Sequence, residues 1–98
     1  MTPQRIQRKR TKGWRLPPNT VCVTRPGKWG NPFRVGHLSE YGDVPDAETA
    51  VAFHRAWIDK GLQRVEIVRE LRGKNLACYC PLGTPCHADT LLELANKD

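Results

Sequence analysis

The sequence has no apolar run long enough to span a bilayer, and its N-terminus lacks the apolar core of a secretory signal peptide. These absences exclude a transmembrane helix and lead us to expect a cytoplasmic protein without a membrane partner. Internal repeats and low-complexity tracts are also absent, which indicates one compact unit. With 39% hydrophobic residues and three tryptophans among 98 residues, the chain is expected to form a single domain over residues 1–98.

Acidic residues are absent from residues 1–39, which carry nine lysines and arginines, whereas residues 40–98 carry seven basic and ten acidic side chains. Such a one-sided positive field attracts phosphate groups and predicts a nucleic acid or a nucleotide as partner. Trp14 and Trp29 stand among these cations, where their rings could stack on bases. Residues 1–12 form a basic arm that is either flexible or an edge strand. The competing interpretation is a solvated tail that only aids solubility.

Glycine and proline are concentrated in residues 25–45, which predicts a long ordered loop after a short strand at residues 20–24. In its first part, residues 25–33, two glycines permit tight turns close to a ligand. Cationic, aromatic and amide side chains in this loop and in the basic arm are the expected contacts to a nucleic acid or nucleotide: Arg8, Arg10, Lys12, Trp14, Arg25, Lys28, Trp29 and Asn31. Taken singly, Trp29 and Phe33 are more typical of anchors to the core.

Helical signals follow this loop. Asp46 has the character of an N-cap, and apolar residues at helical spacing predict a first helix that Gly61 ends. A second helix is expected over residues 62–71, with Val65, Val68 and Leu71 facing the core, and Gly73 stops it.

A buried strand at residues 75–80 and an amphipathic helix at residues 87–96 complete the pattern. A strand, two helices and a second strand favour a right-handed crossover that pairs the two strands in parallel. The predicted fold is therefore a small single α/β domain, with a short, largely parallel sheet and about three helices, similar to a fragment of a Rossmann fold.

Four ligands suited to a soft metal fall within ten residues: Cys78, Cys80, Cys86 and His87. Zinc is the expected ion, because thiolates and imidazole are its usual ligands, although this spacing is not that of a common zinc finger or ribbon. On a strand, Cys78 and Cys80 point to the same face. A reducing compartment disfavours a disulfide between Cys80 and Cys86.

Two other interpretations of this segment stay open. In the catalytic one, Cys86, His87 and Asp89 act from the first turn of the last helix, where free N–H groups and the helix dipole stabilise a thiolate or an anion. In the structural one, the three cysteines are small buried residues that pack between sheet and helix.

Three motifs resemble those of a family of small, functionally uncharacterised domains found in bacteria and phages. They are an Arg- and Lys-rich segment ending in Gly-Trp at residues 8–14, a Lys-Trp-Gly-Asn-Pro-Phe loop at residues 28–33, and a Leu-x-Cys-x-Cys…Cys-His-x-Asp-x-Leu-Leu segment at residues 76–92. The resemblance covers nearly the whole chain. It implies that the loop and the cysteine segment form one site, and it carries no activity, substrate or catalytic residue.

Parallel pairing of the two strands would bring the loops at residues 25–33 and 78–89 to the same edge of the sheet, where they would face each other across a cleft. We expect this cleft to bind a nucleic acid or a nucleotide, and its chemistry could extend to processing a base or a nucleoside. The alternative is a non-catalytic interaction module that metal or its cysteines stabilise, with a protein as partner.

Overall fold

Three parallel strands form the main sheet of the protein. A computed structural model describes the structure of residues 3–25, 27–61 and 63–97. In the sheet, β5 (Asn75–Cys78) lies between β1 (Arg5–Gln7) and β2 (Thr20–Cys22), and both pairings are parallel. The parallel pairing of β2 with β5 confirms the prediction from the strand and helix order. The segment expected to be a basic arm contributes β1, an edge strand of this sheet.

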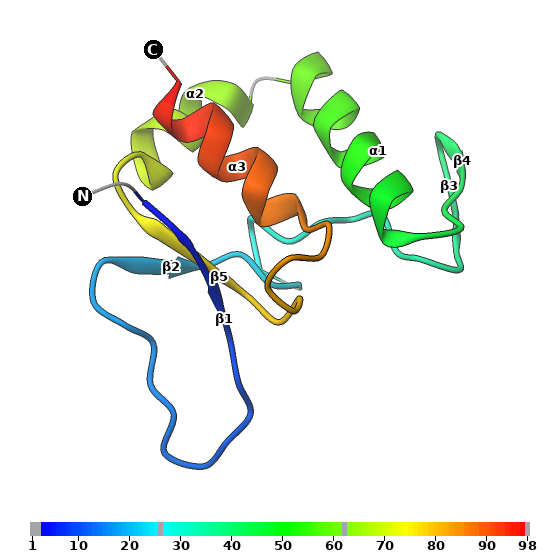
Figure 1. The fold of residues 1–98 in the computed structure, drawn as a ribbon. Coiled ribbons are helices and arrows are strands. Elements are labelled where there is room, and N and C mark those ends of the chain that lie inside the picture. Colours follow the sequence, from blue (N-terminus) through cyan, green and yellow to red (C-terminus); the bar gives the residue numbers. More distant parts are fainter. Residues whose placement is uncertain (1–2, 26, 62, 98) are drawn as a thin grey trace.

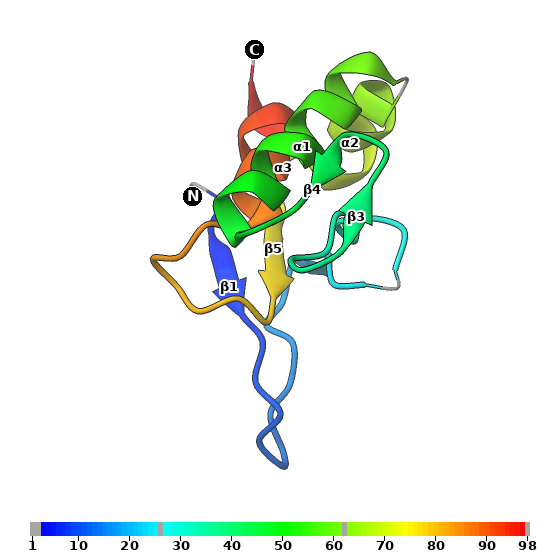
Figure 2. The same ribbon diagram turned by 90° about the vertical axis from the view of Figure 1, so that its right-hand side faces the viewer.

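Three helices lie on one side of the sheet in both views (Figures 1 and 2). They are α1 (Ala47–Lys60), α2 (Gln63–Leu71) and α3 (His87–Asn96). Asp46 caps α1 as expected, because its carboxylate accepts a hydrogen bond from the Thr49 N–H at 2.8 Å. Three helices over a short parallel sheet confirm the predicted α/β class. Among the described residues, no helix has both the length and the apolar character needed to cross a membrane.

The second helix buries Leu71 as predicted, but its buried stripe passes through Ile67 rather than Val65. Leu62, its expected first residue, lies outside the described residues. Ile67 and Leu71 are fully buried, whereas Val65, expected to face the core, is 62% exposed. Each residue turns an α-helix by roughly 100°, so Val65 lies on the opposite side from Ile67. The prediction for Val65 was therefore wrong, and Val68 is only half-buried.

The segment expected to be one long loop contains a small hairpin. β3 (Leu38–Ser39) and β4 (Gly42–Asp43) pair in an antiparallel manner. The Ser39 hydroxyl donates to the Gly42 carbonyl oxygen at 2.7 Å, and Gly42 has a φ of +113°, a conformation that favours glycine. Two-residue strands are too short to give an alternating pattern, so no local signal predicted this hairpin.

The core has two parts. The main one fills the space between the sheet and the helices with apolar side chains from every layer, including Val23, Ile58, Ile67, Leu71, Leu76 and Leu91. The smaller one is centred on Phe33 and Val44, which pack against α1 near the β3–β4 hairpin. Phe33 is 4% exposed, and Trp29 packs against the main core. Both aromatic side chains therefore anchor the loop after β2, as expected of each taken singly.

The connection from β1 to β2 extends away from the sheet and helices in both views (Figures 1 and 2). This projecting loop, residues 8–19, carries five of the cations of the basic segment: Arg8, Lys9, Arg10, Lys12 and Arg15. Lys12 is exposed and Trp14 is half-buried. Because β1 and β2 lie on either side of β5, the loop is tied to the domain at both ends.

Candidate metal centre and its cleft

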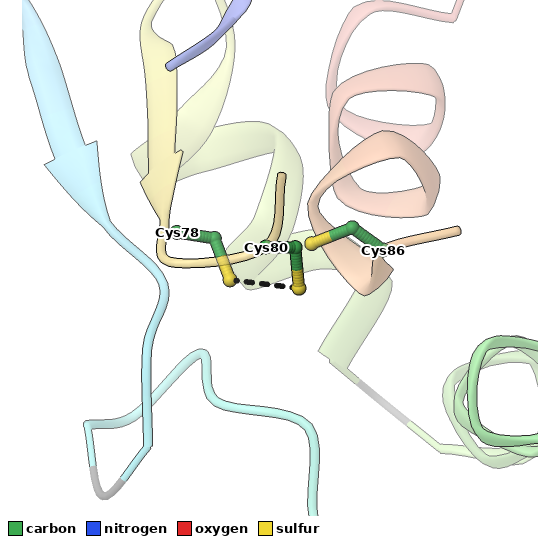
Figure 3. Close-up of side chains that lie close together, drawn as sticks. All are labelled: Cys78, Cys80 and Cys86. Carbon is green, nitrogen blue, oxygen red and sulfur yellow. Dashed lines mark hydrogen bonds between the residues drawn. The ribbon is translucent and has the colours of Figure 1, made fainter. Parts of the chain in front are cut away.

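The three clustered cysteines come together at the end of β5. Cys78 is the last residue of β5, and Cys86 is the N-cap residue of α3. The Sγ atoms of Cys78, Cys80 and Cys86 all lie within 4.8 Å of one another, and those of Cys78 and Cys80 are 3.6 Å apart (Figure 3). In a tetrahedral zinc–thiolate site the sulfurs are about 3.8 Å apart, because Zn–S bonds are about 2.3 Å long. This cysteine triad could therefore hold a metal ion.

His87, the fourth expected ligand, lies beside the triad but is engaged elsewhere. Its Nε2 is 2.6 Å from the Val23 carbonyl oxygen, which can only accept, so Nε2 carries the proton and donates it. The Nδ1 lone pair then faces Cys86 Sγ at 3.8 Å. The ring is buried, and burial lowers its pKa. The structure thus brings together the three sulfurs without the imidazole, and His87 contacts the triad through Cys86.

The thiols of the triad change one another's acidity. Hydrogen bonding to the Cys86 thiol lowers the pKa of Cys78 to about 5. The same bond raises the pKa of Cys86, and burial raises the pKa of Cys80. Of the three thiols, Cys78 therefore loses its proton most readily. A divalent cation would stabilise all three thiolates and displace the thiol protons that remain.

A cleft of about 640 Å³ lies between the loop after β2 and the loop after β5. Both loops leave the carboxyl ends of parallel strands, which is where open α/β sheets commonly bind ligands. All three cysteines of the triad line this cleft, and so does His87. Three of the described residues that line it have a positively charged side chain: Arg10, Arg25 and Arg34. No aspartate or glutamate lines it among the described residues.

Backbone contacts hold the wall of the cleft formed by the loop after β2. Arg25 Nη1 donates to the Asn31 carbonyl oxygen at 2.9 Å. The buried Asn31 amide donates from Nδ2 to the Ala50 carbonyl oxygen at 3.2 Å and accepts at Oδ1 from the Phe33 N–H at 2.8 Å. A Cβ at Gly30 would lie 2.8 Å from the Arg25 Cα, so this turn needs glycine. Asn31, expected to contact a base edge, is therefore engaged with the protein's own backbone.

Lys28 and Trp29, two further expected ligand contacts, lie on the side of the same loop that faces away from the cleft and toward α2. Lys28 Nζ pairs with Glu70 at 2.7 Å and with Glu66 at 3.2 Å on α2, and it lies 4.9 Å from the centre of the Trp29 ring. Neither residue lines the cleft. A phosphate would have to compete with two carboxylates for Lys28, so we do not count this lysine among the ligand contacts of the cleft.

Two arginines at the start of the projecting loop contact Tyr79. The guanidinium carbons of Arg8 and Arg10 lie 4.6 Å and 4.3 Å from the centre of its ring. Arg8 Nη1 also donates to the Thr24 hydroxyl at 3.0 Å. These cation–π contacts attach the projecting loop to the cysteine segment. Arg10 and Tyr79 both line the cleft, so the cationic surface of the loop is continuous with it.

Asp89, expected to act with His87, instead pairs with Arg5. The Arg5 Nη1 atom donates to Asp89 Oδ2 at 2.9 Å and to the Thr84 carbonyl oxygen at 2.8 Å, and Nη2 donates to the Pro81 carbonyl oxygen at 2.9 Å. One guanidinium from β1 thus closes the loop that carries the chain from Cys80 to α3. Asp89 does not line the cleft among the described residues, which assigns it to this ion pair.

Arg5→Ala should destabilise the domain by about 2 kcal/mol and weaken metal binding, because it removes three hydrogen bonds from a side chain that is 8% exposed. Urea unfolding and a zinc competition titration would measure the two effects. Arg55→Ala is the matched control, since Arg55 forms an exposed ion pair with Glu93 that contributes about 0–1 kcal/mol. Equal losses in the two variants would contradict the role given to Arg5.

A buried histidine pair makes the stability of the domain depend on pH. His54 is 1% exposed, and its ring centre lies 5.2 Å from that of His87. Burial first, and the charge of His87 second, lower the pKa of His54 from 6.5 to about 3. The unfolded chain therefore binds a proton at a higher pH than the folded one, and stability is lost as the pH falls from 6.5 toward 3.

We expect the free energy of unfolding to fall by about 2 kcal/mol between pH 7.5 and pH 5 because of His54, at about 1.4 kcal/mol per pH unit below 6.5. Urea denaturation in the presence of chelator would measure it without a contribution from metal release. His54→Gln should remove this part of the pH dependence. If wild type and variant show the same slope, the loss has another source.

The arrangement combines an anion-attracting cleft with a thiol centre. A bound divalent metal would supply Lewis acidity there, while Arg25 and Arg34 would hold a negatively charged group beside it. The sequence alone did not single out Arg34, Tyr79 or Arg5. In the sequence, these residues differ in no way from the other basic and aromatic residues. Their contacts are with segments far away in the sequence, which no local spacing pattern predicts.

Comparison with known proteins identifies a family whose function is unknown. No curated protein and no solved structure matches the chain. A family model described as a domain of unknown function, DUF4326, matches residues 6–97, which include β2, the cysteine triad and all three helices. The protein therefore belongs to the DUF4326 family, which agrees with the expected resemblance to a family of functionally uncharacterised domains.

Proposed function

We propose that this domain binds the phosphate groups of a nucleic acid or a nucleotide in the cleft beside the cysteine triad, which holds a zinc ion. The observation that carries the proposal is the charge of the cleft: Arg10, Arg25 and Arg34 line it, and no carboxylate does so among the described residues. Planar guanidinium groups suit phosphate, because they can donate two parallel hydrogen bonds.

The projecting loop favours a nucleic acid over a free nucleotide. Its cations continue from Arg10, which lines the cleft, to Lys12 and Arg15, which are exposed and do not line it. Trp14, which is half-buried, offers part of its ring to a base. Tyr79 joins the loop to the cleft through its contacts with two arginines. A strand that lay along the loop would thus reach the triad.

Three thiolates around a tetrahedral ion leave its fourth position for another ligand, which is the pattern of catalytic rather than closed structural zinc sites. All three cysteines line the cleft, so a substrate whose phosphate is bound there could supply the ligand at that fourth position. This favours the processing of a base or nucleoside as the reaction. The alternative, a metal-stabilised interaction module, is favoured by the position of the triad, which would fasten the end of β5 to the start of α3.

Binding should be measured by fluorescence anisotropy with a labelled single-stranded DNA oligonucleotide and its RNA counterpart at several salt concentrations. Two or three phosphate contacts predict that log Kd rises with log[salt] with a slope of about 1.5–2, at about 0.7 per contact on a single strand. Adenosine monophosphate as competitor distinguishes a nucleotide site from a strand-binding surface. Absent or salt-independent binding of both oligonucleotides and of the mononucleotide would refute the proposal.

A further inference from the structure

Two sulfur atoms of the cysteine triad lie close enough to join in a disulfide. The Sγ atoms of Cys78 and Cys80 are 3.6 Å apart, and both residues are free thiols (Figure 3). The chain bends at Tyr79 and Cys80, after the end of β5. A fully extended chain would separate the two Cα atoms by roughly 7 Å, and the bend brings them within the span that a disulfide bridges. The sulfurs would then need to approach by about 1.5 Å to reach the S–S bond length of about 2.05 Å.

Cys80 is the member of the triad that a small molecule in the cleft reaches most readily. It is half-buried, whereas Cys78 and Cys86 are 6% and 2% exposed. All three line the cleft of about 640 Å³, which is far larger than a peroxide molecule. Cys86 Sγ lies within 4.8 Å of the other two sulfurs, but it also faces His87 Nδ1 at 3.8 Å. An oxidant therefore meets Cys80 first, and the thiol of Cys78 is in contact with it.

Protein groups alone hold the loop that carries Cys80. Arg5 Nη2 donates to the Pro81 carbonyl oxygen at 2.9 Å, and Arg5 Nη1 donates to the Thr84 carbonyl oxygen at 2.8 Å. The Thr84 hydroxyl donates to the same Pro81 oxygen at 2.6 Å. The residue that follows Cys80 is thus fixed by two side chains. Because none of these contacts involves a sulfur atom, Cys78 and Cys80 stay neighbours whether or not a metal is bound.

We propose that the triad is a peroxide-sensitive switch in which Cys78 and Cys80 form a reversible disulfide. The Cys80 thiol gives up its proton, and its sulfur attacks one oxygen of hydrogen peroxide and breaks the O–O bond. The departing hydroxide takes the proton and leaves as water, so Cys80 becomes a sulfenic acid. The Cys78 sulfur then attacks the Cys80 sulfur, and the Cys78 proton leaves with the sulfenic hydroxyl as a second water. Two thiols have lost two electrons to the peroxide, and a thiol reductant reverses the change.

The disulfide would take two of the three thiolate ligands from the metal. Thiolates are the form of cysteine that binds zinc, and Cys86 alone would remain, so the ion would be released. This consequence rests on the proposed function, which assigns zinc to the triad. The three arginines of the cleft are unchanged by the oxidation, so the oxidised domain should still bind an oligonucleotide. In reducing compartments most disulfides are transient and many sense oxidants, which is how this one would act.

Titration of the full chain with hydrogen peroxide tests the switch, on protein purified without chelator. After denaturation, the number of thiols that an alkylating reagent labels should fall from four to two. Mass spectrometry of the peptides should find the label on Cys22 and Cys86 and not on Cys78 or Cys80. Dithiothreitol should restore all four thiols. A chromophoric chelator should record zinc release at the rate at which thiols are lost.

Two variants define the outcomes. Cys22→Ser is the matched control, because Cys22 is a half-buried thiol outside the triad, and it should lose the same two thiols as wild type. Cys80→Ser should keep all its thiols at the same dose of peroxide. No loss of thiols in wild type, a disulfide that includes Cys86 or Cys22, equal loss in Cys80→Ser, or a product that dithiothreitol does not reverse would each overturn the proposal.

The same experiment separates the switch from the proposed function. If the disulfide forms in protein that carries no zinc, the metal site of the proposed function fails and the switch stands. If zinc is bound and oligonucleotides bind, but peroxide leaves all four thiols free, the switch fails and the proposed function stands.

Discussion

Cys78→Ser should lower the melting temperature by about 10–20 °C and abolish stoichiometric zinc binding. Cys78 is the member of the triad whose pKa is lowered, to about 5, so it supplies the most readily formed thiolate. Structural zinc contributes about 10–16 kcal/mol of binding free energy in zinc-finger peptides, and the loss of one ligand removes part of that. Each kcal/mol corresponds to about 4–8 °C in a domain of this size.

Differential scanning calorimetry with and without chelator, combined with elemental analysis of protein purified without chelator, would measure both effects. Cys22→Ser is the matched control, because Cys22 is also a free, partly buried thiol in the sheet but lies outside the triad. Chelator should lower the melting temperature of wild type and of the control variant and leave that of Cys78→Ser unchanged. A control variant that loses as much stability and metal as Cys78→Ser would show that the triad has no special role.

Reversing the charge at Arg10 and Arg34 together should weaken binding of a single-stranded oligonucleotide by about 50- to 100-fold at 50 mM salt. Both arginines line the cleft. Each lost phosphate contact on a single strand lowers the salt slope by about 0.7, which corresponds to about eightfold in affinity at this concentration. The variant should therefore show a flatter salt dependence as well as a higher Kd. Anisotropy measurements between 50 and about 300 mM salt would give both quantities.

Arg64→Glu with Arg69→Glu is the control of equal net charge. Both are exposed residues of α2, and neither lines the cleft. This variant should keep most of the affinity and most of the salt slope, because only charges near the bound strand release counterions. Equal losses in the two double variants would mean that net charge alone governs binding, and the cleft would no longer be the preferred site. Unchanged melting temperatures would exclude unfolding as the cause.

The helices, the parallel pairing and the family could be predicted from the sequence because their signals are local. Asp46 and Gly61 mark the ends of α1 within the segment itself, and both act there as expected. The order of strand, helices and strand allows few connections, so it predicted that β2 pairs with β5. The same order predicted a ligand-binding edge, where the loops after β2 and β5 now line one cleft.

The sequence by itself determined that three cysteines lie within nine residues, at the end of a strand, in the loop after it and at the start of a helix. The strand expected over residues 75–80 ends at Cys78, and that the three sulfurs meet was decided by the fold. Only the tertiary structure decided what surrounds them. Arg5 reaches the cysteine loop from a strand more than seventy residues away, and Val23 engages His87 across a similar separation. Lys28 forms an ion pair with Glu70 of α2. Such contacts depend on which surfaces pack together, and no periodicity or spacing within one segment encodes them.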